Sequence, residues 1–305
     1  MKFTIEIFAD TVCPWCYLGK RKLDAAINTH RERYPGDEFD LVWRPFILFP
    51  EAKVSSYDKQ EVLNLIYREN TPTVLRKLER AGEDHGIRFR WDGRTGNAAD
   101  SHKIILLAAL QDSSFSSQCQ SPPFSSSSVT PFPPTTPTSS SSSTFPLPIS
   151  SLLSTPTPEP QARGHQKGGK KQDKVIEVLC SGALQNGEDL SDRNFLIRVA
   201  LECGLAADEK GVKDWLDSEE AARLLADARH HGTPTTITTA TAGQQQQEQK
   251  PTEDNGGRKL QITAVPSYLV QGRFYVGGMQ ESDVFVRLFE RICGLQQSQS
   301  PPYPN

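Results

Sequence analysis

Two cysteines near the start of the chain have the spacing of a redox-active pair. They stand in the segment Cys13-Pro14-Trp15-Cys16, which follows a predicted strand and opens a predicted helix. Free backbone N–H groups and the positive end of the helix dipole stabilise a thiolate at such a place, which makes it a better nucleophile and leaving group. Pro14 suits the first helical position because its missing N–H would have no partner there. We therefore predict that Cys13 is the exposed attacking thiol and Cys16, one turn deeper, the resolving thiol.

The same pair could instead be half of a zinc site, or two cysteines that only pack. A zinc site needs two further ligands at characteristic spacing, and the sequence contains neither a second C-x-x-C nor an H-x₃-H. Cys180 and Cys203 lie in helical patterns and are expected to be small core residues. Because the strand-to-helix context favours redox chemistry, we expect no metal and no resident cofactor.

A proline near the end of the chain is the second candidate element. It lies in Ala264-Val265-Pro266-Ser267, just before a predicted hairpin. Proline cannot donate to a strand ladder, and a cis Val265–Pro266 bond at the strand entrance would resolve this conflict. The loop could then lie against the sulfurs while Val265 offers backbone groups to an extended substrate. An ordinary turn proline is the other interpretation, and the residues alone leave both open.

Charged residues around the pair are weaker candidates. Asp10 and Glu6 could relay a proton to Cys16, although carboxylates are mostly exposed and merely solvated. Lys20 and Arg21 lie further along the predicted helix, and we expect them on the surface.

The elements that must position these residues follow from hydrophobic periodicity. Residues 2–9 alternate as a strand, residues 13–33 have helical spacing, and residues 40–46 read as a second strand. Together they predict a βαβ unit. A terminal hairpin and a helix beginning at Ser282 complete an α/β fold.

The middle of the chain predicts a helical subdomain and two disordered insertions. Helical patterns fill residues 57–112, where the first helix is expected over 57–70, and resume over 174–231. Residues 113–173 and 232–259 are low-complexity stretches that bury too little apolar surface to order. We therefore expect a discontinuous α/β domain over 1–56 and 260–305, with the helical subdomain inserted.

Composition excludes several partners and locations. The 305 residues carry a formal net charge of −3, which gives no reason to expect binding to nucleic acid or an anionic membrane. Glu6 and Asp10 interrupt the first residues before a signal-peptide core develops. The six cysteines are few and irregularly spaced, so they are not a disulfide framework. We expect a cytoplasmic location.

Several motifs together resemble one family. They are the segment Asp10–Lys20 around the cysteines, Trp43-Arg-Pro-Phe46, Asn97-Ala-Ala-Asp-Ser-His102, Ala264-Val-Pro-Ser267 and Gly277-Gly-Met-Gln280. In this order they resemble the DsbA-like thioredoxin superfamily, and its FrnE-type branch in particular. That branch is related to 2-hydroxychromene-2-carboxylate isomerases and kappa-class glutathione transferases. The resemblance implies a thioredoxin domain split by a helical insertion, with a cis-proline at Pro266.

The resemblance also implies an activity. A cysteine at position 13 together with Cys16 favours dithiol–disulfide exchange with a protein or small-molecule disulfide, because the isomerase and transferase relatives place a serine at position 13. A glutathione-dependent isomerase or transferase is the alternative, and glutathione could be a co-substrate in either case. His102 falls on the family's Asn…His stretch at the start of a predicted helix. It could contact the substrate, or it could cap or pack against that helix. A third hypothesis is a binding module with vestigial cysteines.

Overall fold

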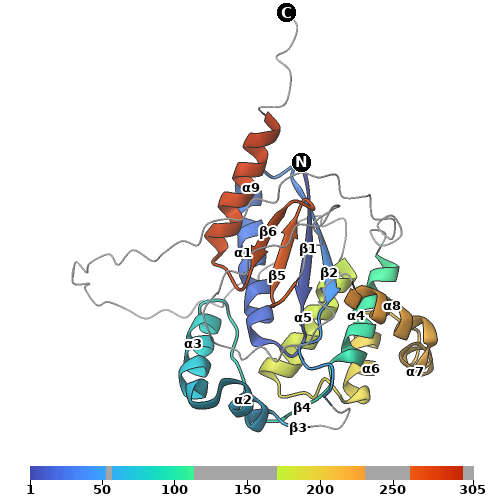
Figure 1. Ribbon diagram of the computed structural model, residues 1–305. Coiled ribbons are helices and arrows are strands. Elements are labelled where there is room, and N and C mark those ends of the chain that lie inside the picture. Colours follow the sequence, from blue (N-terminus) through green and yellow to red (C-terminus); the bar gives the residue numbers. More distant parts are fainter. Residues whose placement is uncertain (53–56, 113–169, 231–261, 298–305) are drawn as a thin grey trace, which may run out of the picture.

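The computed structural model describes residues 1–52, 57–112, 170–230 and 262–297 (Figure 1). Most of the two stretches expected to be disordered, 113–173 and 232–259, lie outside these residues. Within the described parts no helix has both the length and the apolar character needed to cross a membrane.

One mixed sheet forms the centre of the molecule. Among the described residues its strands follow the order β2-β1-β5-β6. The parallel pair is β1 (Lys2–Ala9) and β2 (Glu38–Pro45), and the antiparallel strands are β5 (Ser267–Val270) and β6 (Phe274–Gly277). β1 and β5 are neighbours in this sheet, so the end of β1 that precedes the cysteines lies beside the start of β5, which follows Pro266.

Two helices join the sheet into a thioredoxin-like unit. They are α1 (Pro14–Arg33) and α9 (Ser282–Gln297), which pack against each other in Figure 1. Strand alternation sends Phe3 and Phe39 to the face under these helices, where their rings stack 4.9 Å apart and meet Phe289 of α9. On the opposite face a smaller cluster forms around Phe8 and Leu269.

A block of helices is inserted between β2 and β5. A two-stranded ribbon of β3 (Tyr57–Asp58) and β4 (Arg94–Thr95) lies at its edge. The helices are α2 (Lys59–Tyr67), a 3₁₀ turn (Arg68–Asn70), α3 (Thr71–Glu83), α4 (Ala99–Gln111), α5 (Lys170–Gln185), α6 (Arg193–Glu202), α7 (Glu209–Asp217) and α8 (Glu219–His230). In Figure 1 these helices occupy one end of the molecule, around the beginning of α1.

Two boundaries differ from the sequence-based expectation. Helix α5 begins at Lys170 and not at 174, because the Asp112 carboxylate at the end of α4 accepts hydrogen bonds from the backbone N–H groups of Lys171 and Gln172. The ends of α4 and α5 therefore lie side by side. Residues 57–58 are a strand and not helical, because they pair with β4, and the Asp58 side chain then caps α2.

Candidate active site

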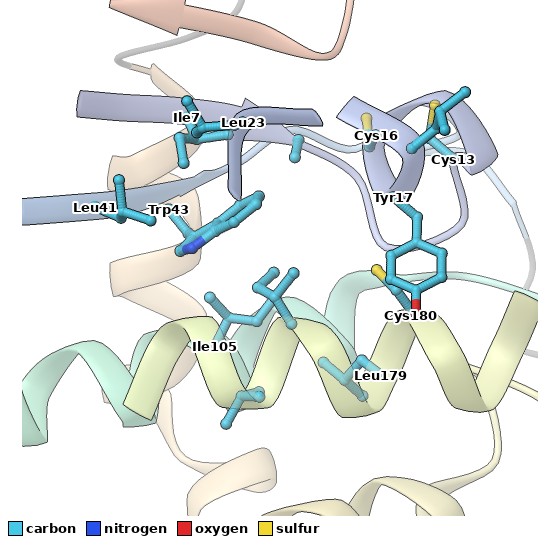
Figure 2. Packing of buried hydrophobic residues seen from close by; sticks show 14 of the residues in the cluster. Ile7, Cys13, Cys16, Tyr17, Leu23, Leu41, Trp43, Ile105, Leu179 and Cys180 are labelled. Atoms are coloured by element: carbon cyan, nitrogen blue, oxygen red, sulfur yellow. The ribbon is translucent and has the colours of Figure 1, made fainter. Parts of the chain in front are cut away.

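The backbone places the two cysteines at the start of α1. Cys13 is the residue before the helix, in an extended conformation with φ −89° and ψ 113°, and Pro14 occupies the first turn. The Cys13 carbonyl accepts the first helical hydrogen bonds, from the N–H of Cys16 at 3.0 Å and of Tyr17 at 3.3 Å. Figure 2 shows both sulfur atoms at this end of the helix. The expected relation between the C-x-x-C segment and the helix terminus is therefore present.

Neither thiol is exposed, which corrects the expectation for Cys13. Cys13 is 6% exposed and Cys16 3%. The inserted helices cover Cys13. Tyr67 at the end of α2 and Cys180 of α5 both lie close to Cys13: burial is the main cause that raises the pKa of each, and the charge of Cys13 adds to it. Sequence reasoning treated Cys180 as a core residue and did not place it near the pair.

The two sulfurs interact with each other. The pKa of the Cys16 thiol is raised well above its ordinary value, first by burial and then by a hydrogen bond and the charge of Cys13. A backbone hydrogen bond from Asp10 opposes this shift. Cys16 thus keeps its proton at neutral pH, as a resolving thiol would.

The loop before β5 lies against α1 just beyond the cysteines. The Val265–Pro266 peptide bond is cis. A Cβ atom at Gly19 would stand 3.0 Å from Cγ of Pro266 and 2.3 Å from the hydroxyl oxygen of Tyr268, so only glycine permits this approach. Val265 packs against the hydrophobic cluster that contains both cysteines.

Tyr268 is a site residue that sequence reasoning missed. Its side chain is fully buried, and its hydroxyl group has no hydrogen-bond partner among the described residues. Burial raises its pKa, and the charge of Cys16 adds to this effect. Strand alternation could have indicated it, because residue 268 follows Pro266 by two positions and both side chains approach Gly19 of α1.

Asp10 and His102, the two tentative candidates, meet beneath the cysteines. Oδ1 of Asp10 lies 3.2 Å from Nε2 of His102, and Oδ2 accepts a hydrogen bond from the backbone of Leu48 at 2.7 Å. Both side chains are almost completely buried. The carboxylate of Asp10 is close enough to Cys16 to raise its pKa. Glu6 takes no part, because it pairs with Arg44 at 2.8 Å.

Trp15 connects the site to the helical block. Its indole lies close enough to the hydroxyl of Tyr67 to lower the pKa of that group, but burial has the larger effect and raises the pKa of Tyr67 to about 12. The ammonium group of Lys77 on α3 lies 5.8 Å from the centre of the Trp15 ring, at cation–π distance. Neither partner could be found from the sequence, because both come from helices far from the motif.

A buried ionic network ties α1 to α5, and it corrects the expectation that Lys20 is a surface residue. The Lys20 side chain is 4% exposed and contacts carboxylates of Asp24 at 2.8 Å, Asp173 at 3.3 Å and Glu177 at 3.5 Å. The Tyr17 hydroxyl donates to Glu177 at 2.8 Å. In Figure 2 the Tyr17 ring points from α1 toward α5, beside Cys180. Since Tyr17 follows Cys16 directly, this network fixes the helical block next to the dithiol.

A comparison with a solved structure agrees with this architecture. A structure of a probable DsbA oxidoreductase from Streptomyces coelicolor is similar with a TM-score of 0.60 and 17% identity, over 99% of this chain and 93% of that one. The 2-hydroxychromene-2-carboxylate isomerase structure aligns with a TM-score of 0.48 and 10% identity, over 98% and 100%. The cytosolic disulfide reductase DsbM from Pseudomonas aeruginosa with GSH aligns with a TM-score of 0.46 and 12% identity, over 95% and 99%.

The sequence comparisons are more restricted. No match is found among curated protein sequences. The family described as DSBA-like thioredoxin domain matches residues 4–119, a span that begins in β1 and includes the C-x-x-C segment and α4. Residues 4–119 are therefore similar to DSBA-like thioredoxin domains, and the chain has a DsbA-like thioredoxin fold into which a block of helices is inserted.

Proposed function

We propose that the protein is a thiol–disulfide oxidoreductase that works through Cys13 and Cys16. The observation that carries this proposal is the contact between the two thiols at the first turn of α1, in which Cys16 keeps its proton. A pair of inert packing cysteines would not need the helix terminus, the cis Val265–Pro266 bond and a buried carboxylate around it.

The reaction proceeds by two exchange steps. The Cys13 thiolate attacks one sulfur of a substrate disulfide, which forms a mixed disulfide and releases the other substrate sulfur as a thiolate. Cys16 then loses its proton and attacks Cys13, which forms the Cys13–Cys16 disulfide and releases the second substrate thiol. Two electrons pass from the dithiol to the substrate. The reverse sequence oxidises a substrate dithiol.

The second step requires an acceptor for the Cys16 proton. Asp10 is the nearest candidate, because its carboxylate is buried, lies beside Cys16 and is held in place by His102 and the backbone of Leu48. In this proposal His102 is a positioning residue, and Trp15 and Val265 line the approach of the substrate.

The substrate is a protein or small-molecule disulfide, and glutathione is proposed as a reductant that restores the dithiol. No metal and no resident cofactor take part in this chemistry. The scarcity of cysteines supports a reducing compartment such as the cytoplasm. The motifs around residues 10–20 and 97–102 support the FrnE-type branch of the superfamily.

Two alanine variants test the proposal. With glutathione disulfide or insulin as substrate, Cys13→Ala should abolish turnover, and Cys16→Ala should abolish turnover while accumulating a mixed disulfide on Cys13 that mass spectrometry detects. A Cys16→Ala variant that keeps full disulfide turnover would contradict the two-cysteine exchange mechanism. A variant that loses disulfide turnover but keeps a glutathione-dependent isomerase activity would favour the isomerase. A wild-type Cys13 whose alkylation by iodoacetamide rises only near pH ~8.5, as for an ordinary thiol, would favour a binding module instead.

A further inference from the structure

A second group of sulfur, nitrogen and oxygen donors lies at the opposite end of α1. We call it the distal cluster; it consists of Met1, His30 in the last turn of α1, Asp37 just before β2, and Cys293 in α9. Figure 1 shows the start of the chain and α9 together at this end of the molecule. His30 lies 14 positions after Cys16, which corresponds to roughly 21 Å along a helix. The distal cluster is therefore separate from the dithiol.

The donor atoms of the distal cluster converge. Nε2 of His30 is 2.8 Å from Oδ2 of Asp37, and the same oxygen is 4.0 Å from the sulfur of Cys293. The ligand atoms of these three residues all lie within 4.8 Å of one another. The thioether sulfur of Met1 lies 3.8 Å from the Cys293 sulfur, on the same side.

This donor set has the chemistry of a zinc site. Imidazole nitrogen, thiolate sulfur and carboxylate oxygen are the ligands that Zn²⁺ prefers, with bonds of about 2.0–2.3 Å. In a tetrahedral site, two ligand atoms at such distances from one ion lie about 3.3–3.5 Å apart, so side-chain movements on the order of 1 Å bring all three within bonding distance. The Met1 sulfur or a water molecule can complete a tetrahedron.

The surroundings hold the ligands ready. The His30 ring is fully buried among aromatic rings, with centroids 5.3 Å from Phe3 and 5.6 Å from Phe289, and these contacts fix the direction of Nε2. Its Nδ1 atom has no hydrogen-bond partner among the described residues. Oδ1 of Asp37 accepts a hydrogen bond from the amino group of Met1 at 2.5 Å, which leaves Oδ2 directed at His30 and Cys293.

We propose that the distal cluster binds one Zn²⁺ ion through His30, Asp37 and Cys293. The ion takes the place of the proton between Nε2 and Oδ2, and that proton moves to Nδ1 of the same ring, so that the imidazole stays neutral. The Cys293 thiol releases its proton to solvent. No oxidation state changes. The ion would join α1, α9 and the start of β2, which stabilises the thioredoxin unit without touching the dithiol.

Zinc titration of the full chain tests the proposal. Because any vicinal pair of thiols can chelate added zinc, the titration uses a Cys13→Ser/Cys16→Ser background, in which we expect one Zn²⁺ per chain. Adding Cys293→Ser should weaken zinc binding at least about tenfold. Even the loss of a group that only hydrogen-bonds a metal ligand costs about that much affinity, and Cys293 is a ligand itself. Cys203→Ser, at the end of α6, is the matched control and should leave the affinity unchanged. Binding that persists unchanged in Cys293→Ser, or no stoichiometric binding in the background, would overturn the proposal.

A second measurement does not depend on the folding of a variant. In the unsubstituted protein, zinc should slow the alkylation of Cys293, read peptide by peptide in a mass spectrometer, and should leave that of Cys203 unaltered. Co²⁺ in the Cys13→Ser/Cys16→Ser background should give a thiolate-to-metal absorption band that Cys293→Ser removes. Equal alkylation of Cys293 with and without zinc would count against the site.

Discussion

Each end of helix α1 lies beside cysteine sulfur and a histidine–aspartate pair. The two ends differ in how far apart in the sequence these residues are. At the first turn, Cys13 and Cys16 are three residues apart and the helix itself brings them together. At the last turn, His30 meets Cys293, which is 263 positions away, through packing of α9. The first arrangement can be found from local spacing, whereas the second exists only in the folded chain.

The largest expected effect separates the roles of the two ends. Cys13→Ser should reduce disulfide turnover to the uncatalysed rate, because the remaining thiol of the pair, Cys16, is buried and keeps its proton. Cys293→Ser should leave disulfide turnover unchanged, since Cys293 lies at the far end of α1 from the dithiol. A coupled glutathione disulfide assay measures both. Loss of activity in Cys293→Ser with an unaltered circular dichroism spectrum would break the separation.

A pair of glycines sharpens the comparison at the level of packing. Gly19→Ala should destabilise the protein by about 1–3 kcal/mol, because the added Cβ meets the Tyr268 hydroxyl and the Pro266 ring. Gly36→Ala, at the other end of α1, has no atom within 4 Å of its new Cβ and should stay within about 0.5 kcal/mol. Urea unfolding measures both changes. Equal effects would mean that the cis-proline loop does not press against α1.

The free energy of unfolding of the reduced protein should also depend on pH, because the Cys16 thiol at the first turn of α1 is buried. The folded-state pKa of Cys16 is raised above its ordinary value of 9.0, mainly by burial. The free energy of unfolding is therefore unaffected by this thiol below pH 9 and falls as the pH rises above 9. The reason is that Cys16 then ionises in the unfolded chain but keeps its proton in the folded chain. The slope approaches about 1.4 kcal/mol per pH unit for one thiol. Urea midpoints between pH 8 and 10.5 should show a smaller slope in Cys16→Ala; an identical slope would contradict the assignment.

The smallest expected effects come from two tyrosines beside the dithiol. Tyr17→Phe removes the hydrogen bond to Glu177 and should destabilise the protein by about 1 kcal/mol. Tyr268→Phe removes a buried hydroxyl that has no partner among the described residues, so it should be neutral or stabilising by up to about 1 kcal/mol. Chemical denaturation compares the two variants. A clear destabilisation by Tyr268→Phe would reveal a hydrogen bond to this hydroxyl.

Local patterns in the sequence were sufficient for the central unit. Alternation over residues 2–9 and the C-x-x-C segment predicted β1, the start of α1 and the strand-to-helix context of the cysteines. The inserted helices were also expected, apart from the strand at 57–58 and the start of α5. These two boundaries depend on pairing with β4 and on capping by Asp112, which are contacts between distant segments.

The surroundings of the dithiol were harder to predict for the same reason. Burial of Cys13, the indole–phenol contact of Trp15 with Tyr67, and the buried position of Lys20 all arise from helices that pack over α1. Hydrophobic periodicity gives the face of a helix but not its partner, so a lysine in the predicted helix was expected at the surface. Asp10 and His102 were each suspected, but their pairing required the fold.

The Asp112 carboxylate has a consequence for the evolution of the chain. By holding the first residues of α5 at the end of α4, it makes the exit and the return of the intervening segment a single point on the surface. A segment whose two ends are already close together can be lengthened without displacing the helices that it joins. Each doubling of its length costs only about 0.6 kcal/mol in loop-closure entropy. This junction can therefore accept sequence of almost any length, including a transplanted domain, while the redox chemistry nearby stays intact.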